Sequence, residues 1–279
     1  MDLDDEQTKL WNGSAGQAWV DAQELLDGIL QPFEDLLLQA VSARQPRRVL
    51  DVGCGSGSTT LAIARLLGSR GECIGIDVSE PLIAAAQARA ERAKSPARFI
   101  RANAQLQEFE SATFDMVVSR FGVMFFDDPV RAFNNFRVAA SPGADLRCIA
   151  WRGPAENPFM TTAERAAAPL LPNLPPRRPD APGQFAFADR NRVSSILEKS
   201  GWTNIEIQPM DVPCTFPERA LDAYLTRMGP VGMALQDADE RTRTQVAATV
   251  RAAFEPYVQG NEVRFTAACW MVNARESVD

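Results

Sequence analysis

Carboxylates and glycines stand in this chain at a spacing that suits the binding of a nucleotide-type ligand. The run Val49-Leu50-Asp51-Val52-Gly53-Cys54-Gly55-Ser56-Gly57 joins an apolar strand to three alternating glycines, and Asp77 lies twenty residues after its last glycine. Glycine takes left-handed backbone angles freely and lets a ligand approach the main chain closely. An acid at the end of the following strand can accept hydrogen bonds from both hydroxyls of a ribose. The sequence therefore predicts a site for a nucleotide-containing cofactor.

The glycine spacing separates this turn from two common nucleotide-binding motifs. The phosphate-binding loop ends in Gly-Lys-Ser/Thr, and no such lysine follows here. The dinucleotide fingerprint is Gly-x-Gly-x-x-Gly, whereas Gly53, Gly55 and Gly57 form Gly-x-Gly-x-Gly. The spacing therefore disfavours both motifs. Because the second motif is that of dinucleotide-binding proteins, it also disfavours a nicotinamide-dependent oxidoreductase.

Apolar runs alternate with segments of helical spacing along most of the chain, which predicts an α/β fold with a Rossmann-like, doubly wound sheet. In such a sheet the ligand binds at the carboxyl ends of the strands. Asp51, Asp77, Asn103 and Ser119 all stand at such ends. The expected strands are 49–52, 73–78, 97–101, 113–122, 146–151, 204–209 and 263–273, and the expected helices between them are 58–67, 81–94, 129–140 and 189–200.

The form Asp-Val-Gly-Cys-Gly-Ser-Gly of residues 51–57 resembles the first motif of the class I S-adenosylmethionine (AdoMet) methyltransferases. The chain is similar to the branch that includes quinone C-methyltransferases and other small-molecule enzymes. The resemblance covers 45–151 best and implies seven strands, the last antiparallel and inserted between the fifth and the sixth. The chain departs from the family pattern at Ala144 and Asp145, where Gly and a basic residue are commoner.

The resemblance also implies which residues hold the cofactor. In this family an Asp usually stands where Asn103 does and holds the adenine amine. Asn keeps the accepting oxygen but loses the charge, so this contact is expected to be weaker. The residues assigned to the cofactor are Asp51, Gly53, Cys54, Gly55, Gly57, Asp77, Val78, Asn103, Ala104, Ser119 and Arg120.

Segments outside the sheet are expected to hold the substrate. We expect an N-terminal helical arm or lid at 1–45 and a methyltransferase domain at 46–279 with insertions at about 152–184 and 211–262. The arm should contain a helix over 25–44, interrupted or started near Pro32, and its two tryptophans either close over the cofactor or merely fasten the arm. The insertion after 213 should form helices around 218–228 and 237–257. The residues expected in the pocket wall are Trp11, Trp19, Phe121, Met124, Trp151, Phe159 and Met228.

The chain contains no histidine, so any general base must be another group, a water or the acceptor itself. Glu156 and Tyr224 lie in the insertions and are weak candidates, as is Arg120, which could orient a substrate carboxylate or phenolate or hold an acid near the cofactor. The sequence thus predicts catalysis chiefly by proximity and alignment.

Composition limits the partners. The net charge of −7 argues against a nucleic-acid substrate bound through its phosphates. No apolar run is long enough to span a membrane, and the acidic start has no signal-peptide pattern, so a cytoplasmic protein is expected. Five cysteines without paired spacing, in a chain that lacks histidine, predict no metal site. The oligomeric state stays open.

These observations predict an AdoMet-dependent methyltransferase that acts by in-line displacement on a small, hydrophobic or aromatic molecule. The alternatives are a pericyclase or decarboxylase that binds AdoMet on the same fold without transferring its methyl, the nicotinamide oxidoreductase disfavoured above, and a catalytically silent partner subunit.

Overall fold

The computed structural model describes residues 6–174, 177–178 and 181–277, and its centre is a mixed sheet. The strands are β1 (Arg48–Val52), β2 (Glu72–Asp77), β3 (Arg98–Arg101), β4 (Phe114–Arg120), β5 (Ala140–Trp151), β6 (Thr203–Pro217), β7 (Val258–Gln259) and β8 (Glu262–Arg275). Their order is β3-β2-β1-β4-β5-β8-β6, with β7 paired to β8. β1 to β5 pair in parallel, and β8 is antiparallel to both β5 and β6. The predicted Rossmann-like sheet with an inserted antiparallel last strand is confirmed.

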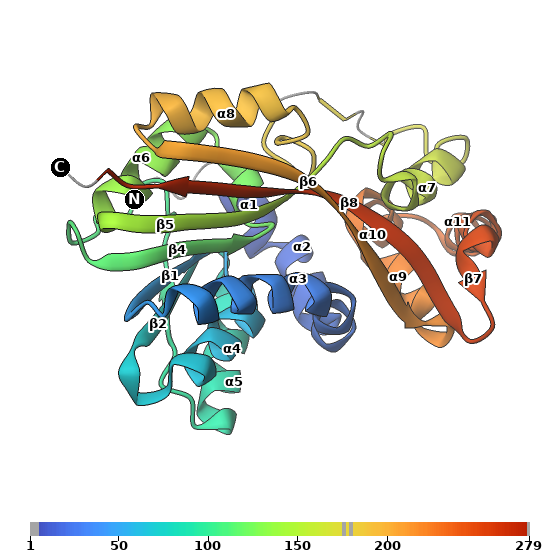
Figure 1. Ribbon diagram of the computed structural model, residues 1–279. Coiled ribbons are helices and arrows are strands. Elements are labelled where there is room, and N and C mark those ends of the chain that lie inside the picture. The colour runs from blue at the N-terminus through green and yellow to red at the C-terminus, as the bar shows by residue number, and fades with distance from the viewer. Residues whose placement is uncertain (1–5, 175–176, 179–180, 278–279) are drawn as a thin grey trace.

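Helices cover both faces of this sheet (Figure 1). The helices are α1 (Glu6–Asn12), α2 (Ser14–Asp21), α3 (Gln23–Arg44), α4 (Ser58–Leu67), α5 (Glu80–Ala93), α6 (Pro129–Ala139), α7 (Pro158–Ala167), α8 (Arg190–Lys199), α9 (Leu221–Arg227), α10 (Gly229–Gln236) and α11 (Glu240–Ala253). α3, α4 and α5 lie on one face, and α6 and α8 lie on the other. No helix of the described residues is both long and apolar enough to cross a membrane.

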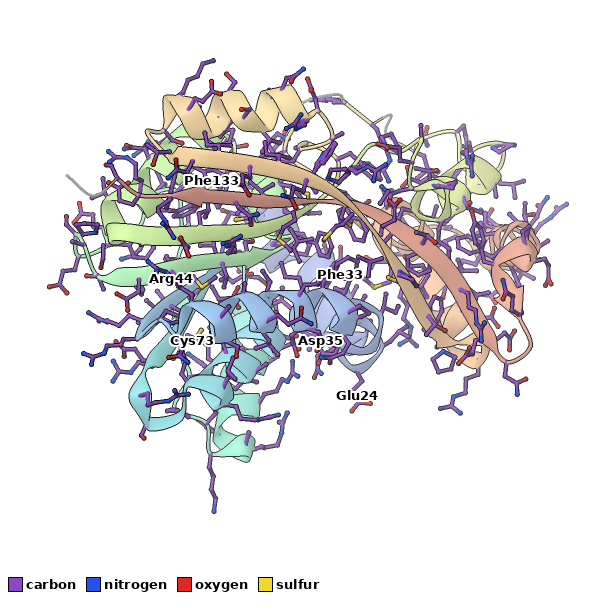
Figure 2. All side chains as sticks on the ribbon, in the orientation of Figure 1. Glu24, Phe33, Asp35, Arg44, Cys73 and Phe133 are labelled. Carbon is purple, nitrogen blue, oxygen red and sulfur yellow. The ribbon has the colours of Figure 1, made fainter. Side chains whose placement is uncertain are left out.

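The long helix α3 passes through Pro32, so the predicted interruption is wrong. A proline inside a helix costs about 3 kcal/mol, because it lacks the N–H donor and its ring meets the preceding turn. Burying one large apolar side chain contributes about 1.5–3 kcal/mol, and α3 buries Leu26, Ile29, Leu30, Phe33, Leu37 and Val41. Burial therefore outweighs the proline. Figure 2 shows Phe33 on the sheet side of this helix and the exposed Glu24 away from it.

The sixth strand is much longer than the predicted 204–209, because β6 continues to Pro217 alongside β8. The two strands extend beyond the sheet toward α7, α9, α10 and α11 (Figure 1). Pro209, Pro213 and Pro217 concealed this length, since proline is rare inside strands except on an edge strand. β6 is such an edge strand, because β8 is the only strand of the described residues that pairs with it.

The insertion between β6 and β8 holds three helices where two were expected. Met228 is extended and Gly229 has a φ of +67°, so the chain does break between α9 and α10, close to the expected place. The segment after that break forms α10 itself, which was predicted to be irregular. Its Val231, Gly232 and Leu235 are buried, and this burial favours a helix there despite two glycines and a proline.

A buried asparagine fastens the start of α7 to β8. The Asn157 side chain donates to the carbonyl of Ala268 at 2.9 Å and accepts from the N–H of the same residue at 2.9 Å. It also donates to the carbonyls of Arg152 and Gly153, both at 3.2 Å. One side chain therefore satisfies main-chain groups of two segments that are more than a hundred residues apart.

Replacing Asn157 with alanine should lower the free energy of unfolding by about 2–4 kcal/mol, because buried main-chain groups lose their partners. Denaturant unfolding measures this change. The control is Asn191→Ala on the exposed start of α8, for which a change within about 0.5 kcal/mol is expected. Equal effects of the two substitutions would contradict the assigned role.

Candidate functional site

The glycine turn after β1 is held by contacts that only glycine permits. Gly53, Gly55 and Gly57 have φ values of +67°, +53° and +83°. A Cβ on Gly53 would lie 2.5 Å from the Cα of Gly122, and one on Gly57 would lie 2.7 Å from the ring of Phe99. A Cβ on Gly55 would meet no protein atom within 4 Å. Two of the glycines are thus required for packing, and Gly55 faces open space on the wall of a cavity.

Asp77, at the end of β2, is fixed by main-chain N–H groups. One carboxylate oxygen accepts from the N–H of Gly55 and the other from the N–H of Ser79, each at 2.9 Å. Burial raises the pKa of Asp77, and the hydrogen bonds from the backbone of Ser79, Gly55 and Val78 act in the opposite direction. The carboxylate is therefore oriented but its charge is incompletely compensated.

Asp51, at the carboxyl end of β1, is more strongly perturbed. Its side chain is buried and accepts a hydrogen bond of 2.6 Å from the hydroxyl of Thr60. Burial raises the pKa of Asp51 to about 7, while the Thr60 hydrogen bond and Arg120 lower it and Glu34 and Asp77 raise it further. The cavity wall thus carries the buried Asp51 and the partly buried Asp77, two acids that a bound cation would stabilise.

Arg120 lies among acids of the N-terminal helices. Its guanidinium is 3.7 Å from a carboxylate oxygen of Glu34 and donates to the carbonyl of Leu30 at 3.3 Å. Burial lowers the pKa of Arg120, and the charges of Glu34, Asp27 and Asp51 oppose this change. The sequence left open whether Arg120 orients the substrate or holds an acid near the cofactor. This geometry matches the second role, with Glu34 as the acid.

Sequence reasoning missed the residues that connect α3 to this cluster. Glu34 is buried in α3 and accepts a hydrogen bond from Ser58 at the start of α4. Asp27 pairs with Arg89 of α5 at 2.7 Å, and Arg89 also donates to the carbonyl of Ser56 in the glycine turn at 2.8 Å. One signal was available: Glu34 stands at helical spacing between apolar residues of α3, where an unpaired charge would be costly.

The glycine turn, Asp51, Asp77 and Arg120 line one side of a cavity of about 450 Å³. That volume falls within the usual range of small-molecule sites, about 300–1,000 Å³. The cavity also reaches α1 to α3, the turn after β4, α7 and the insertion between β6 and β8. The N-terminal helices and the insertion therefore enclose a single space with the carboxyl edge of the sheet.

The first helix is fastened to the loop that follows Asp77. Asn12 donates to the carbonyl of Val78 at 3.1 Å and accepts from the N–H of Glu80 at 2.9 Å. The hydroxyl of Ser79 donates to the carbonyl of Trp11 at 2.6 Å. The helical break at Gly13 still leaves the two tryptophan rings in contact, with Trp11 and Trp19 centroids 5.7 Å apart.

The structure brings most of the sequence-predicted site residues to this cavity. From the cofactor set it lines the wall with Asp51, Gly53, Cys54, Gly55, Asp77, Val78, Asn103, Ala104 and Arg120. From the substrate and catalytic sets it does so with Trp11, Trp19, Phe121, Met124, Trp151, Phe159, Met228 and Tyr224.

Gly57, Ser119 and Glu156 are not brought to the cavity wall. Ser119 donates to the carbonyl of Val52 at 2.7 Å and accepts from the N–H of Gly122 at 3.1 Å, so it supports the turn from behind. Glu156 lies in a second hollow and pairs with Arg152, which holds the pKa of Glu156 below its usual range. A carboxylate in that position is a poor general base.

Asn103 is engaged locally. Its side-chain oxygen accepts from the N–H of Gln105 at 3.0 Å, which shapes the turn after β3. The Asn103 oxygen, which was expected to accept from the adenine amine, thus already accepts a hydrogen bond from the main chain.

Comparison with known proteins agrees with this geometry. Residues 49–143 match a family described as a methyltransferase domain. A demethylmenaquinone methyltransferase of Lactiplantibacillus plantarum is 28% identical over 170 residues, which are 57% of this chain and 72% of that protein.

Solved structures share the fold at low sequence identity. The YcgJ protein of Bacillus subtilis superposes with a TM-score of 0.57 and 16% identity, over 88% of this chain and 97% of that one. The [4+2]-cyclase SpnF superposes with a TM-score of 0.51 and 20% identity, over 88% of this chain and 81% of that one.

The sheet, the glycine turn with its two acids, and these likenesses are those of the class I AdoMet-dependent methyltransferases. Within that class the chain is similar to the quinone methyltransferases, and the methyltransferase domain that it matches indicates AdoMet as the cofactor. The residues present fit this group, because AdoMet carries a sulfonium and an ammonium that relieve buried negative charge, and Gly55 leaves room beside the turn.

Buried Asp51 should make the stability of the cofactor-free protein depend on pH. With a pKa of about 7 when folded and an ordinary value of 3.8, this carboxyl retains its proton in the folded chain after the unfolded chain has lost it. Its contribution to the free energy of unfolding therefore falls as the pH rises from about 4 to about 7 and is constant above that. At 1.36 kcal/mol per pKa unit, the full change is about 4 kcal/mol.

The comparison of Asp51→Asn with the parent isolates this contribution, because the amide keeps an acceptor for Thr60 and cannot ionise. Unfolding measured from pH 5 to 7.5 should show the variant gaining stability relative to the parent as the pH rises. The absence of histidine leaves few other groups that titrate in this window. Parallel stability curves would show that Asp51 is ionised throughout.

Alanine at three left-handed glycines should separate folding from cofactor binding. Gly53→Ala forces two main chains apart and should abolish stable folding. Gly55→Ala should fold with a cost of about 1–2 kcal/mol and weaken AdoMet at least about tenfold in calorimetry, because its methyl group occupies cavity space. Gly260→Ala is the control, with a φ of +62° and open surroundings away from the cavity. Equal AdoMet affinity in the Gly55 and Gly260 variants would refute the placement.

Proposed function

We propose that this methyltransferase transfers the AdoMet methyl to a small, apolar or aromatic molecule held beside the cofactor in the same cavity. The observation that carries the proposal is the continuity of one cavity from the acid-lined glycine turn to walls of aromatic and aliphatic side chains. Such mostly apolar sites with few polar groups are typical of small-molecule binding.

The acidic side of the cavity would hold the cofactor. Asp77 would accept from the ribose hydroxyls, and Asp51 would favour the positive charge near the glycine turn. AdoMet supplies a methyl group on a sulfonium, which is a strong electrophile with a neutral leaving group. The chain's own tasks are then to align the acceptor and to exclude water.

A flat aromatic surface stands next to this cofactor region. The rings of Phe121 and Trp151 are stacked with centroids 4.1 Å apart, and Phe33 packs edge-on against both. Phe121 has a φ of +64°, a strained conformation for a residue with a side chain. Strain held at this position aims a ring at the cavity and suits a flat acceptor.

Asp51 and Asp77 are assigned to the cofactor. Neither of the other candidate bases, Tyr224 and Glu156, is suited to take a proton from the acceptor. Burial raises the pKa of Tyr224 to about 12, so its phenol stays protonated at neutral pH. Glu156 lies outside the cavity and is held by Arg152. The acceptor should therefore be nucleophilic already or readily ionised. Five free, buried cysteines favour a reducing compartment, which supports a cytoplasmic location.

The proposal is tested by incubating the protein with AdoMet that carries an isotope-labelled methyl group and a panel of phenols and naphthols. Mass spectrometry should find labelled methyl on an acceptor and an equal amount of S-adenosylhomocysteine (AdoHcy). An acceptor that changes structure without AdoHcy formation would indicate the non-methylating alternative.

Asp77→Ala should weaken AdoMet at least about tenfold, because hydrogen bonds to a charged acceptor contribute about 1.5–3 kcal/mol each. Calorimetry on folded protein provides the affinity. Asp35→Ala, on the exposed side of α3, is the control and should bind AdoMet like the parent. Unchanged affinity in the Asp77 variant would show that the ribose lies elsewhere.

A further inference from the structure

The part of the cavity remote from the glycine turn is built around one phenylalanine. Phe159 of α7 stacks on Phe265 of β8 at 3.9 Å and packs edge-on against Phe254 at 5.1 Å. Tyr224 of α9 lies against the same ring at 5.8 Å. All four side chains line the cavity and form an aromatic wall on this side of it.

The hydroxyl of Tyr224 is the polar group of this aromatic wall, and it makes no hydrogen bond with any residue that the structure describes. The other tyrosine of the chain, Tyr257, packs on Phe159 too, at 5.0 Å, but its hydroxyl lies 3.4 Å from the hydroxyl of Thr162. Tyr224 is partly exposed and lies on the wall of the cavity. An unpaired hydroxyl on the wall of a binding cavity is therefore available to a ligand.

The chemistry of this hydroxyl decides what it can bind. Because burial raises the pKa of Tyr224 to about 12, the group keeps its proton and acts as a hydrogen-bond donor. Its close neighbours Phe159 and Phe216, the latter at 5.5 Å, are aromatic rings. The matching ligand group is an oxygen acceptor carried by a flat apolar skeleton.

We propose that the Tyr224 hydroxyl donates a hydrogen bond to an oxygen of the methyl acceptor, at the end of the acceptor remote from the methylated atom. This inference rests on the proposed function. It makes Tyr224 a specificity-determining residue and gives the acceptor class as flat molecules that carry a carbonyl or similar oxygen. The hydrogen bond from the phenol to that oxygen fixes the direction in which the acceptor lies.

A matched ligand pair tests this assignment on the AdoHcy-loaded protein. 2-Acetylnaphthalene and 2-ethylnaphthalene have the same carbon skeleton, and only the first carries an acceptor oxygen. Affinities come from quenching of the tryptophan fluorescence, since Trp11, Trp19 and Trp151 line the cavity. The variants are Tyr224→Phe and, as the matched control, Tyr257→Phe.

Tyr224→Phe should weaken binding of the acetyl compound about three- to tenfold, the range expected for one hydrogen bond. Its affinity for the ethyl compound should be unchanged. Tyr257→Phe should bind both compounds like the parent. Because the lost hydroxyl has no protein partner, Tyr224→Phe should also unfold at the same temperature as the parent or higher, which verifies that it folds.

Two results would overturn the inference while leaving the proposed function standing. The first is an equal loss of affinity for both compounds in Tyr224→Phe, which would indicate a packing role. The second is unchanged affinity for both compounds. Failure of the parent protein to bind both naphthalenes would instead contradict the apolar acceptor site itself.

Discussion

Buried negative charge at the carboxyl edge of the sheet is the constraint on which the rest of this structure depends. Asp51 and Asp77 end neighbouring strands, Asp51 buried and Asp77 partly buried, and among the described residues neither forms an ion pair with a basic side chain. Main-chain N–H groups orient one, and a threonine hydroxyl holds the other. Arg120 offsets part of the charge but is itself shared with Glu34. The site is thus prepared for a cation before any ligand arrives.

The N-terminal helices form part of the same electrostatic unit. α3 contributes Glu34 to the cluster, and its Asp27 holds Arg89, which in turn binds the glycine turn at Ser56. At the other end, Asn12 and the loop after Asp77 exchange hydrogen bonds. A movement of α1 or α3 would therefore disturb polar contacts on both sides of the cofactor region. Access to the cavity is in this way coupled to the shape of the glycine turn.

How far the sequence predicts this molecule depends on the range of the determining interaction. Local signals located the strand, glycine turn and helix around Gly55, because backbone angles and apolar spacing are written in neighbouring residues. The role of Arg120 could not be decided in that way, since its partner Glu34 is brought to it by packing of α3. The length of β6 was concealed by its prolines. The position of Glu156 could not be predicted either, because its ion pair with Arg152 lies in a different hollow.

The prolines of β6 have a consequence beyond the folding of this chain. A long outermost strand exposes a row of main-chain donors and acceptors on which the strand of another molecule can align, and this is a common route to fibrous aggregates. Alternate residues of a strand direct their N–H groups to the same edge, and Pro209, Pro213 and Pro217 occupy one such alternating set. Because the ladder with β8 is intact along this stretch, the donors that are missing belong to the free edge. The rim of the sheet is thereby made a poor template, and contacts between copies of the molecule are directed away from strand pairing.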